Sequence, residues 1–175
     1  MQAAKAETPW REGLYDVLKE VGVRQVVYVP DAGHATLIKQ CHDDPEMKTG
    51  YLTNEFEGVG VCAGAWLGGE RAAMLMQSSG VGNIINALGL VRSCGIPFFT
   101  IVTMRGEWGE FNPWQLPMGQ ATPAVLEAAG VIVNRAAVAE EVVEVVRASA
   151  RLAFSSYAPV AALISQRVIG AKVFK

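Results

Sequence analysis

The sequence is short of the residues from which many catalytic and metal sites are built. It has only two histidines and three cysteines among 175 residues. Cys41, Cys62 and Cys94 are widely separated, so they form neither a Cys-x-x-Cys pair nor a zinc-ligand spacing. The histidines, His34 and His42, are too sparse for a metal cluster, and no Gly-x-Ser-x-Gly segment is present. We therefore expect reduced thiols, no metal ligands in this chain and no hydrolase triad.

The sequence also lacks an excess of charge of one sign, and it has no long apolar run. The formal net charge is only −2, so no nucleic acid or membrane surface is indicated as a partner. The longest uncharged run, residues 72–91, carries several amides and hydroxyls and is therefore too polar for a membrane span. Residues 1–11 mix charges and lack the apolar core of a secretory signal. These absences predict a cytoplasmic protein.

What the sequence does contain is an alternation of helix-like and strand-like segments. The expected helices are residues 10–21, 35–41, 55–69, 83–93, 123–129 and 139–154. The expected strands are residues 25–29, 48–53, 72–76, 96–103, 131–133 and 160–165. Such alternation is typical of right-handed crossovers and a parallel sheet. We predict a single domain spanning residues 1–175, with a three-layer α/β fold in which helices cover both faces of a mostly parallel central sheet.

Polar residues without an obvious helical or turn role gather in four connecting segments. These are residues 30–34, 54–57, 77–83 and 104–120, and each follows an expected strand. Ligands of open parallel sheets bind beyond the carboxyl ends of the strands, where these segments should meet. The sequence therefore predicts one ligand site built from all four.

The segment that begins at Asn54 is the most informative of the four. It places Glu55 and Glu57 at the start of a helix that has three internal glycines and no charge until Glu70. Glycine costs a helix about 1 kcal/mol relative to alanine, so we expect the glycines to allow close approach of the backbone. The plainer interpretation is that Asn54 caps the helix and that both glutamates complement its dipole.

The Gly80-Val81-Gly82 segment follows an expected strand and opens a helix, as a phosphate-binding turn would. It lacks the third glycine of a dinucleotide fingerprint, since Ile85 stands there, and it lacks the Gly-Lys-Ser/Thr of a P-loop. A nucleotide site is therefore weakly supported. Gln77 and the serines after it are compatible with a plain turn.

Two segments together carry a family resemblance. The sequence NEFEGVGVCAGAWLGG (residues 54–69), followed by QSSGVGNIINAL (77–88), resembles the pyrimidine-binding domain of thiamine-diphosphate enzymes. Two further segments restrict the resemblance to one branch of these enzymes. They are VPDAGHATLI (29–38) and RGEWGEFNPWQLPMGQATPAVLEAAGV (105–131). Together they resemble the alpha subunits, or N-terminal halves, of sulfopyruvate and phosphonopyruvate decarboxylases.

The resemblance implies thiamine diphosphate as cofactor and assigns roles to individual residues. Glu55 would hydrogen-bond the aminopyrimidine ring and exchange a proton with it, which activates the cofactor. We take Glu55 and His34 as the catalytic candidates. The expected cofactor contacts are Glu55, Gln77, Ser79, Gly80, Gly82 and Asn83. The expected substrate contacts are Asp31, His34, Arg105 and Gln120.

Two features separate this chain from that family pattern. Ala32 stands where related members often carry serine, which puts the usual acidic substrate in doubt. Trp108 and Trp114 lie in the segment that should line the site. They suit either a flatter, more apolar substrate or an interface with another chain.

The chain contains no Gly-Asp-Gly, the segment through which thiamine-diphosphate enzymes hold Mg²⁺ and the diphosphate. The resemblance therefore implies that a separate subunit carries Mg²⁺ and that the enzyme is a hetero-oligomer. The 51% hydrophobic content agrees with a surface buried against that partner.

We predict the pyrimidine-binding subunit of a split thiamine-diphosphate-dependent 2-oxo acid decarboxylase, which releases CO2 and an aldehyde. Two alternatives stay open. One is a subunit of an acetolactate-synthase-like carboligase, which shares the early chemistry. The other is a regulatory or binding subunit that kept the fold without the chemistry.

Overall fold

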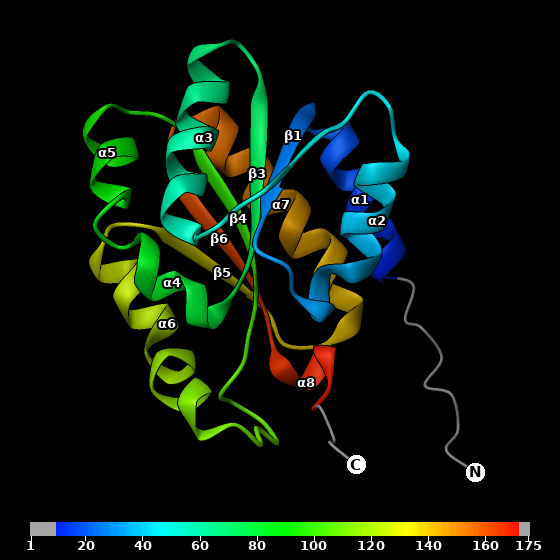
Figure 1. The fold of residues 1–175 in the computed structure, drawn as a ribbon, viewed down its shortest axis with the longest axis vertical. Coiled ribbons are helices and arrows are strands. Elements are labelled where there is room, and N and C mark those ends of the chain that lie inside the picture. The colour runs from blue at the N-terminus through cyan, green and yellow to red at the C-terminus, as the bar shows by residue number, and fades with distance from the viewer. Residues whose placement is uncertain (1–9, 172–175) are drawn as a thin grey trace.

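A computed structural model describes residues 10–171 (Figure 1). Its six strands form one sheet in the order β2-β1-β3-β4-β6-β5, and every neighbouring pair is parallel. The strands are β1 (Val23–Tyr28), β2 (Lys48–Tyr51), β3 (Arg71–Gln77), β4 (Phe98–Thr103), β5 (Ile132–Ala136) and β6 (Pro159–Ile164). Every residue of β4 and β6 is buried, as expected of strands covered on both faces.

The helices complete a three-layer arrangement. They are α1 (Trp10–Glu20), α2 (Ala35–Asp43), α3 (Glu55–Leu67), α4 (Ser78–Ile84), α5 (Leu88–Ser93), α6 (Leu116–Ala128), α7 (Val142–Ser156) and α8 (Gln166–Ile169). Short 3₁₀ turns are η1 (Ala32–His34), η2 (Pro113–Gln115) and η3 (Ala139–Glu141). Among the described residues, no helix has the length and apolar character needed to cross a membrane.

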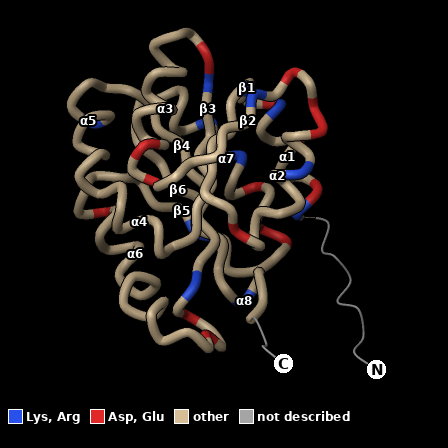
Figure 2. Tube along the Cα trace, in the orientation of Figure 1, with Lys and Arg blue, Asp and Glu red and all other residues tan. Residues whose placement is uncertain are grey.

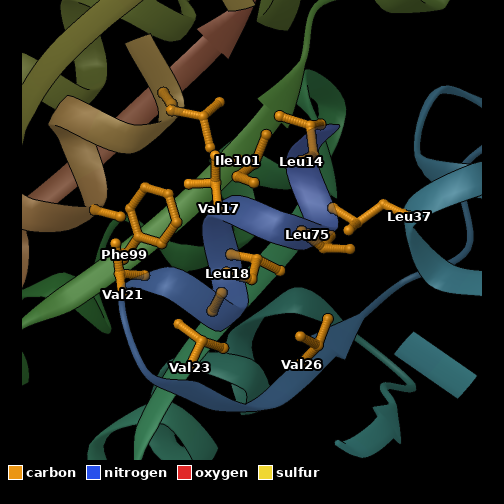
Figure 3. Close-up of a cluster of buried hydrophobic side chains, with 14 of the residues drawn as sticks. Leu14, Val17, Leu18, Val21, Val23, Val26, Leu37, Leu75, Phe99 and Ile101 are labelled. Atoms are coloured by element: carbon orange, nitrogen blue, oxygen red, sulfur yellow. The ribbon is translucent and has the colours of Figure 1, made fainter. Parts of the chain in front are cut away.

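Two buried clusters, one on each face of the sheet, form the core. On one face, α1, α2 and α7 pack on the strands, and Figure 3 shows Val17 of α1 beside Phe99 of β4. On the other face, α3, α4, α5 and α6 pack on the alternate strand residues, such as Met74 and Met76 of β3. This arrangement confirms the predicted α/β class with helices on both faces of a parallel sheet.

Three element boundaries differ from the sequence prediction. The expected loop at residues 77–82 is mostly helical, because α4 begins at Ser78. The single helix expected at residues 83–93 is two helices, α4 and α5. Helix α6 begins seven residues before its expected start, so that Pro123, which the prediction places at the helix start, lies inside the helix.

The glycines of α3 have two different environments. A Cβ at Gly58 would lie 2.7 Å from Leu52 Cδ1 and 2.8 Å from Met74 Cε, so Gly58 allows α3 to lie close to the sheet. Gly60 and Gly64 have no such neighbour within 4 Å and are exposed. The expectation of close approach therefore holds for Gly58 within this chain but not for the other two.

The exposed side of α3 forms an uncharged surface, which we call the α3 outer face. It consists of Phe56, Gly60, Val61, Gly64 and Leu67. Phe56 is 53% exposed and Leu67 is 78% exposed. In Figure 2 the charged residues of α3 lie at its N-terminal end, and α4 below it carries none.

Candidate functional site

The N-terminus of α3 separates the roles of its two glutamates. Asn54 Oδ1 accepts a hydrogen bond from the Phe56 N–H at 2.8 Å. The Glu57 carboxylate reaches back to the N–H groups of Thr53 and Asn54, which completes a capping box. Glu57 therefore serves the helix cap. Glu55, which has no part in the cap, turns toward α4.

The Glu55 carboxyl is held by α4. Its Oε2 accepts a hydrogen bond from Asn83 Nδ2 at 2.8 Å, and only 8% of the residue is exposed. Gly80 lies directly against the carboxyl, because a Cβ there would lie 2.3 Å from Glu55 Oε1. Within the described part of the chain, no lysine or arginine forms an ion pair with Glu55. Glu55 is thus a nearly buried acid that accepts a hydrogen bond from a neutral amide.

This carboxyl lies at the edge of an open cleft of about 860 Å³. The cleft is lined by Glu55, Ser79, Gly80, Asn83, Asn112, Pro113, Trp114, Pro117 and Met118. The wall from α3 and α4 is largely polar, whereas η2 and the start of α6 supply a wall that is mostly apolar. Its volume lies in the range of small-molecule sites.

The predicted cofactor residues converge on this cleft. Four of them line it, namely Glu55, Ser79, Gly80 and Asn83. Gln77 lies behind the wall and accepts a hydrogen bond from Ser79 Oγ at 2.8 Å. Gly82 allows Met118 to approach, since a Cβ at position 82 would lie 3.0 Å from its Sδ.

The predicted substrate residue Asp31 lies elsewhere, at the end of β1. Its carboxylate accepts hydrogen bonds from Thr103 Oγ1 at 2.7 Å, from the Gly33 N–H at 2.9 Å and from Gln77 Nε2 at 3.0 Å. Burial alone would raise the pKa of Asp31, but these donors and the neighbouring His34 outweigh it and hold the pKa below its usual value. Asp31 is therefore ionised at neutral pH and already has donors on both oxygens.

His34 is buried and does not line the cleft. Its Nε2 lies 3.2 Å from the carbonyl oxygen of Met76, so Nε2 carries the hydrogen. Burial lowers the pKa of His34 despite the opposing effect of Asp31. The structure thus places a buried, neutral histidine away from the cleft, although the sequence analysis expected His34 to contact the substrate.

Arg105 is paired within the chain rather than directed at the cleft. Its Nε and Nη2 atoms donate to the two Glu110 oxygens at 2.7 and 2.6 Å, and both side chains are buried. Arg105, Asp31 and Ala32 line a second, smaller cavity of about 160 Å³, together with Arg11. The predicted substrate residues are thus separated from the cleft. Gln120 is exposed on α6.

The two loop tryptophans have different positions. Trp114 lines the cleft and is 83% exposed. Trp108 lies under the guanidinium of Arg167, whose Cζ is 4.0 Å from the ring centroid. Four cleft residues, Asn112, Pro113, Pro117 and Met118, were not among the expected site residues. The available signal was the Asn-Pro pair itself, because Asn112 Oδ1 caps η2 by accepting from the Trp114 N–H at 3.1 Å.

Within residues 10–171 no group of three or more His, Cys, Asp or Glu side chains could hold a metal ion. The cleft offers a ligand a buried carboxyl, hydroxyl and amide groups, and an apolar wall. Those groups suit a planar, partly polar heterocycle more closely than an ion.

Comparison with known proteins identifies the family. No family model matches the chain. The alpha subunit of sulfopyruvate decarboxylase from Methanococcus maripaludis is 37% identical over 154 residues, which cover 87% of this chain and 92% of that protein. The chain belongs to the family of sulfopyruvate decarboxylase alpha subunits.

Longer proteins share the same region. The sulfopyruvate decarboxylase of Methanosarcina acetivorans is 37% identical over 122 residues, which are 69% of this chain but only 31% of that protein. A solved 2-oxoglutarate:ferredoxin oxidoreductase from Magnetococcus marinus superimposes with a TM-score of 0.73 at 14% identity, over 89% of this chain and 28% of that one. At this level of identity the likeness shows a shared fold and carries no functional conclusion.

Proposed function

We propose that this alpha subunit is the pyrimidine-binding half of a split thiamine-diphosphate-dependent decarboxylase. The complete enzyme would convert sulfopyruvate or a related 2-oxo acid into CO2 and an aldehyde. The observation that carries this proposal is the Glu55 carboxyl, which is nearly buried at the cleft edge, hydrogen-bonded by Asn83 and packed on Gly80.

The cleft residues fit the aminopyrimidine end of the cofactor. Glu55 would exchange a proton with a ring nitrogen, while the neutral amide of Asn83 holds its other oxygen in place. Met118, Pro113 and Trp114 would cover the flat ring. When bound, thiamine diphosphate supplies the electron sink that 2-oxo acid decarboxylation requires. The role of this chain would be to hold the ring and control that proton.

The partner would supply the rest of the active site. The matched region is only 31% of the sulfopyruvate decarboxylase from Methanosarcina acetivorans, so more than two thirds of that protein has no counterpart in the match. The described residues also hold no cluster of metal ligands. We therefore place Mg²⁺ and the diphosphate in a separate subunit. The sheet shared by all six strands supports our prediction of one domain in this chain.

The α3 outer face supports the existence of that subunit. It adjoins Glu55, because Phe56 follows Glu55 at the start of the helix. Exposed Phe56 and Leu67 flank glycines whose open surroundings would allow another backbone to approach closely. Burying such an apolar surface favours association.

The test is to purify the tagged chain from its native lysate with Mg²⁺ and thiamine diphosphate present, and to identify the partner. The complex is then assayed for CO2 and aldehyde with sulfopyruvate, phosphonopyruvate and pyruvate. Glu55→Gln should assemble normally and lose at least about 100-fold in turnover, the usual scale for an acid–base group.

Glu57→Gln is the matched control, because glutamine also completes a capping box and Glu57 is turned away from α4. It should keep nearly full turnover. Full turnover by Glu55→Gln would contradict the proposal and favour a regulatory subunit. Products that join two carbonyl compounds would favour a carboligase.

A further inference from the structure

A chain of hydrogen bonds connects the end of β1 with the cleft. Gln77 Nε2 donates to Asp31 Oδ1 at 3.0 Å, and Ser79 Oγ donates to Gln77 Oε1 at 2.8 Å. Ser79 is itself a lining residue of the cleft beside Glu55. Asp31 thus reaches the cleft wall through two hydrogen bonds and one intermediate residue, Gln77, although it does not line the cleft.

The direction of each hydrogen bond is fixed by Asp31. An ionised carboxylate can only accept, so the NH2 group of Gln77 must face it and the Gln77 carbonyl must face Ser79. A carbonyl can also only accept, so the Ser79 hydroxyl must donate its single proton to Gln77. Thr103 Oγ1 and the Gly33 N–H donate to Asp31 Oδ2 and keep the carboxylate in this position.

We propose that Asp31 is a positioning residue that commits the Ser79 proton to Gln77, so that Ser79 presents only oxygen lone pairs to the cleft. A wall of this kind favours a ligand with an N–H donor at that point, such as a heterocycle that carries an amino group. The inference rests on the proposed function, in which the ligand is the aminopyrimidine of thiamine diphosphate, and adds a recognition element to that site.

The competing explanation is that Asp31 only fastens the loop after β1 to β4. Its hydrogen bond to Thr103 joins residues that are 72 positions apart in the sequence and could serve that purpose alone. The two explanations differ in whether Asp31 and Ser79 are energetically coupled. A fastening role changes stability regardless of Ser79, whereas the positioning role acts only through the Ser79 hydroxyl.

A double-mutant cycle on the complex of the full chain with its partner separates them. The variants are Asp31→Asn, Ser79→Ala and the pair, and the readouts are the Kd of thiamine diphosphate with Mg²⁺ by calorimetry and the Tm without cofactor. The asparagine amide can donate to Gln77, which lets the Gln77 amide turn and reverses the Ser79 hydrogen bond. Each single change should weaken binding about tenfold, the value of one hydrogen bond, and the pair should be no weaker than the weaker single variant.

Two further variants keep the test decisive if Asp31→Asn destabilises the fold. Gln77→Met breaks the chain at its middle and leaves the Ser79 proton uncommitted, so it should weaken binding, but by no more than Ser79→Ala, with no added loss in the pair. Thr103→Val removes the fastening bond but leaves the Gln77 contact, so it should lower Tm while leaving Kd within about twofold. Losses of cofactor affinity that add in the double variant would overturn this inference but not the proposed function. Full affinity in Asp31→Asn and Gln77→Met would do the same. A wild-type complex that binds no thiamine diphosphate would overturn the proposed function as well.

Discussion

Gly80 is in direct contact with Glu55, and no larger residue fits between them. A Cβ at position 80 would lie 2.3 Å from Glu55 Oε1 and 2.4 Å from its Cδ, well inside any non-bonded contact. The Gly-x-Gly segment that resembles a phosphate-binding turn therefore has another role here. It brings α4 against a carboxyl group on α3 and so forms the polar wall of the cleft.

Gly80→Ala should displace the Glu55 carboxyl without unfolding the chain. The clashing atoms are the far end of a flexible side chain, which can rotate away, and alanine favours the helical backbone by up to about 1 kcal/mol. We expect an unchanged or higher Tm together with at least about a tenfold weaker affinity of the complex for thiamine diphosphate, as for loss of one charged hydrogen bond. Calorimetry and thermal melts give both values.

Gly89→Ala is the control for this change. Gly89 also lies in a helix, and a Cβ there would have no neighbour within 4 Å. It should keep the cofactor affinity and gain similar helix stability. Wild-type affinity in Gly80→Ala would show that the position of the Glu55 carboxyl is not needed for binding.

Much of the fold could be predicted because its signals are local. The apolar run 96–103 indicated a central strand, and β4 is buried at every position. Asn54 indicated a capped helix start, and the structure adds that Glu57 completes the cap, which leaves Glu55 free for another role. Glu55 and Asn83 were both expected beyond the carboxyl ends of strands, and they meet there at 2.8 Å.

The arrangement of the 104–118 segment could not be predicted in the same way. In an irregular backbone no periodicity links Arg105 to Glu110, so no sequence signal indicated this ion pair and Arg105 was expected to contact the substrate instead. Glu110 also pairs with Gln166, which is 56 positions away and carries no sequence signal for that contact. This segment forms the apolar wall of the cleft, so the sequence predicted only some of the residues of that wall.

Glu110→Gln should make stability less dependent on pH in acid. Burial alone would raise the pKa of Glu110, but hydrogen bonds from Arg105, Asn112, Gly106 and Gln166 outweigh it and hold the pKa at about 2, below the ordinary 4.5. The native chain thus binds fewer protons than the unfolded chain between these values. The stabilisation by Glu110 is present above about pH 4.5 and is lost as the pH falls toward 2.

Urea unfolding of both proteins from pH 7 to pH 3 measures this effect. Near pH 7 the variant should be less stable by about 3 kcal/mol, as expected when one partner of a buried ion pair is removed. The difference should shrink as the pH falls below about 4.5. Glu127→Gln, at an exposed position on α6, is the control and should follow the wild type at every pH. A constant difference between wild type and Glu110→Gln would contradict the assignment.

Gln166→Leu should release the loop that leads into the apolar wall. Gln166 is fully buried, and its Oε1 accepts from the N–H groups of Glu107 and Trp108 at 2.9 and 3.0 Å. Its Nε2 donates to Glu110 at 2.9 Å. Leucine can form none of these bonds, so we expect faster proteolysis within residues 106–112 and a shifted tryptophan emission. Arg167→Met, which removes only the contact with Trp108, should leave the proteolysis rate within about twofold, since surface changes have small effects.

Gly64→Leu should have opposite effects on the isolated chain and on its complex. Gly64 is exposed on α3 with no neighbour within 4 Å of a Cβ, so leucine fits and stabilises the helix by up to about 1 kcal/mol. The same side chain would project from the middle of the α3 outer face and keep a partner backbone away. We therefore expect a raised Tm for the chain alone and at least about a tenfold loss of partner affinity, because overpacking a close interface costs 1 kcal/mol or more.

Ala148→Leu on α7 is the matched control for Gly64→Leu, because it adds the same side chain to an exposed helix position on the opposite face of the sheet. It should leave partner affinity unchanged in a titration of purified subunits followed by calorimetry or sedimentation. Equal losses in both variants would mean that the partner does not distinguish the two faces. Full partner affinity in Gly64→Leu would mean that the interface does not include the α3 outer face. The partner would then have to complete the Glu55 cleft from the side of η2 and α6, where Trp114 is 83% exposed.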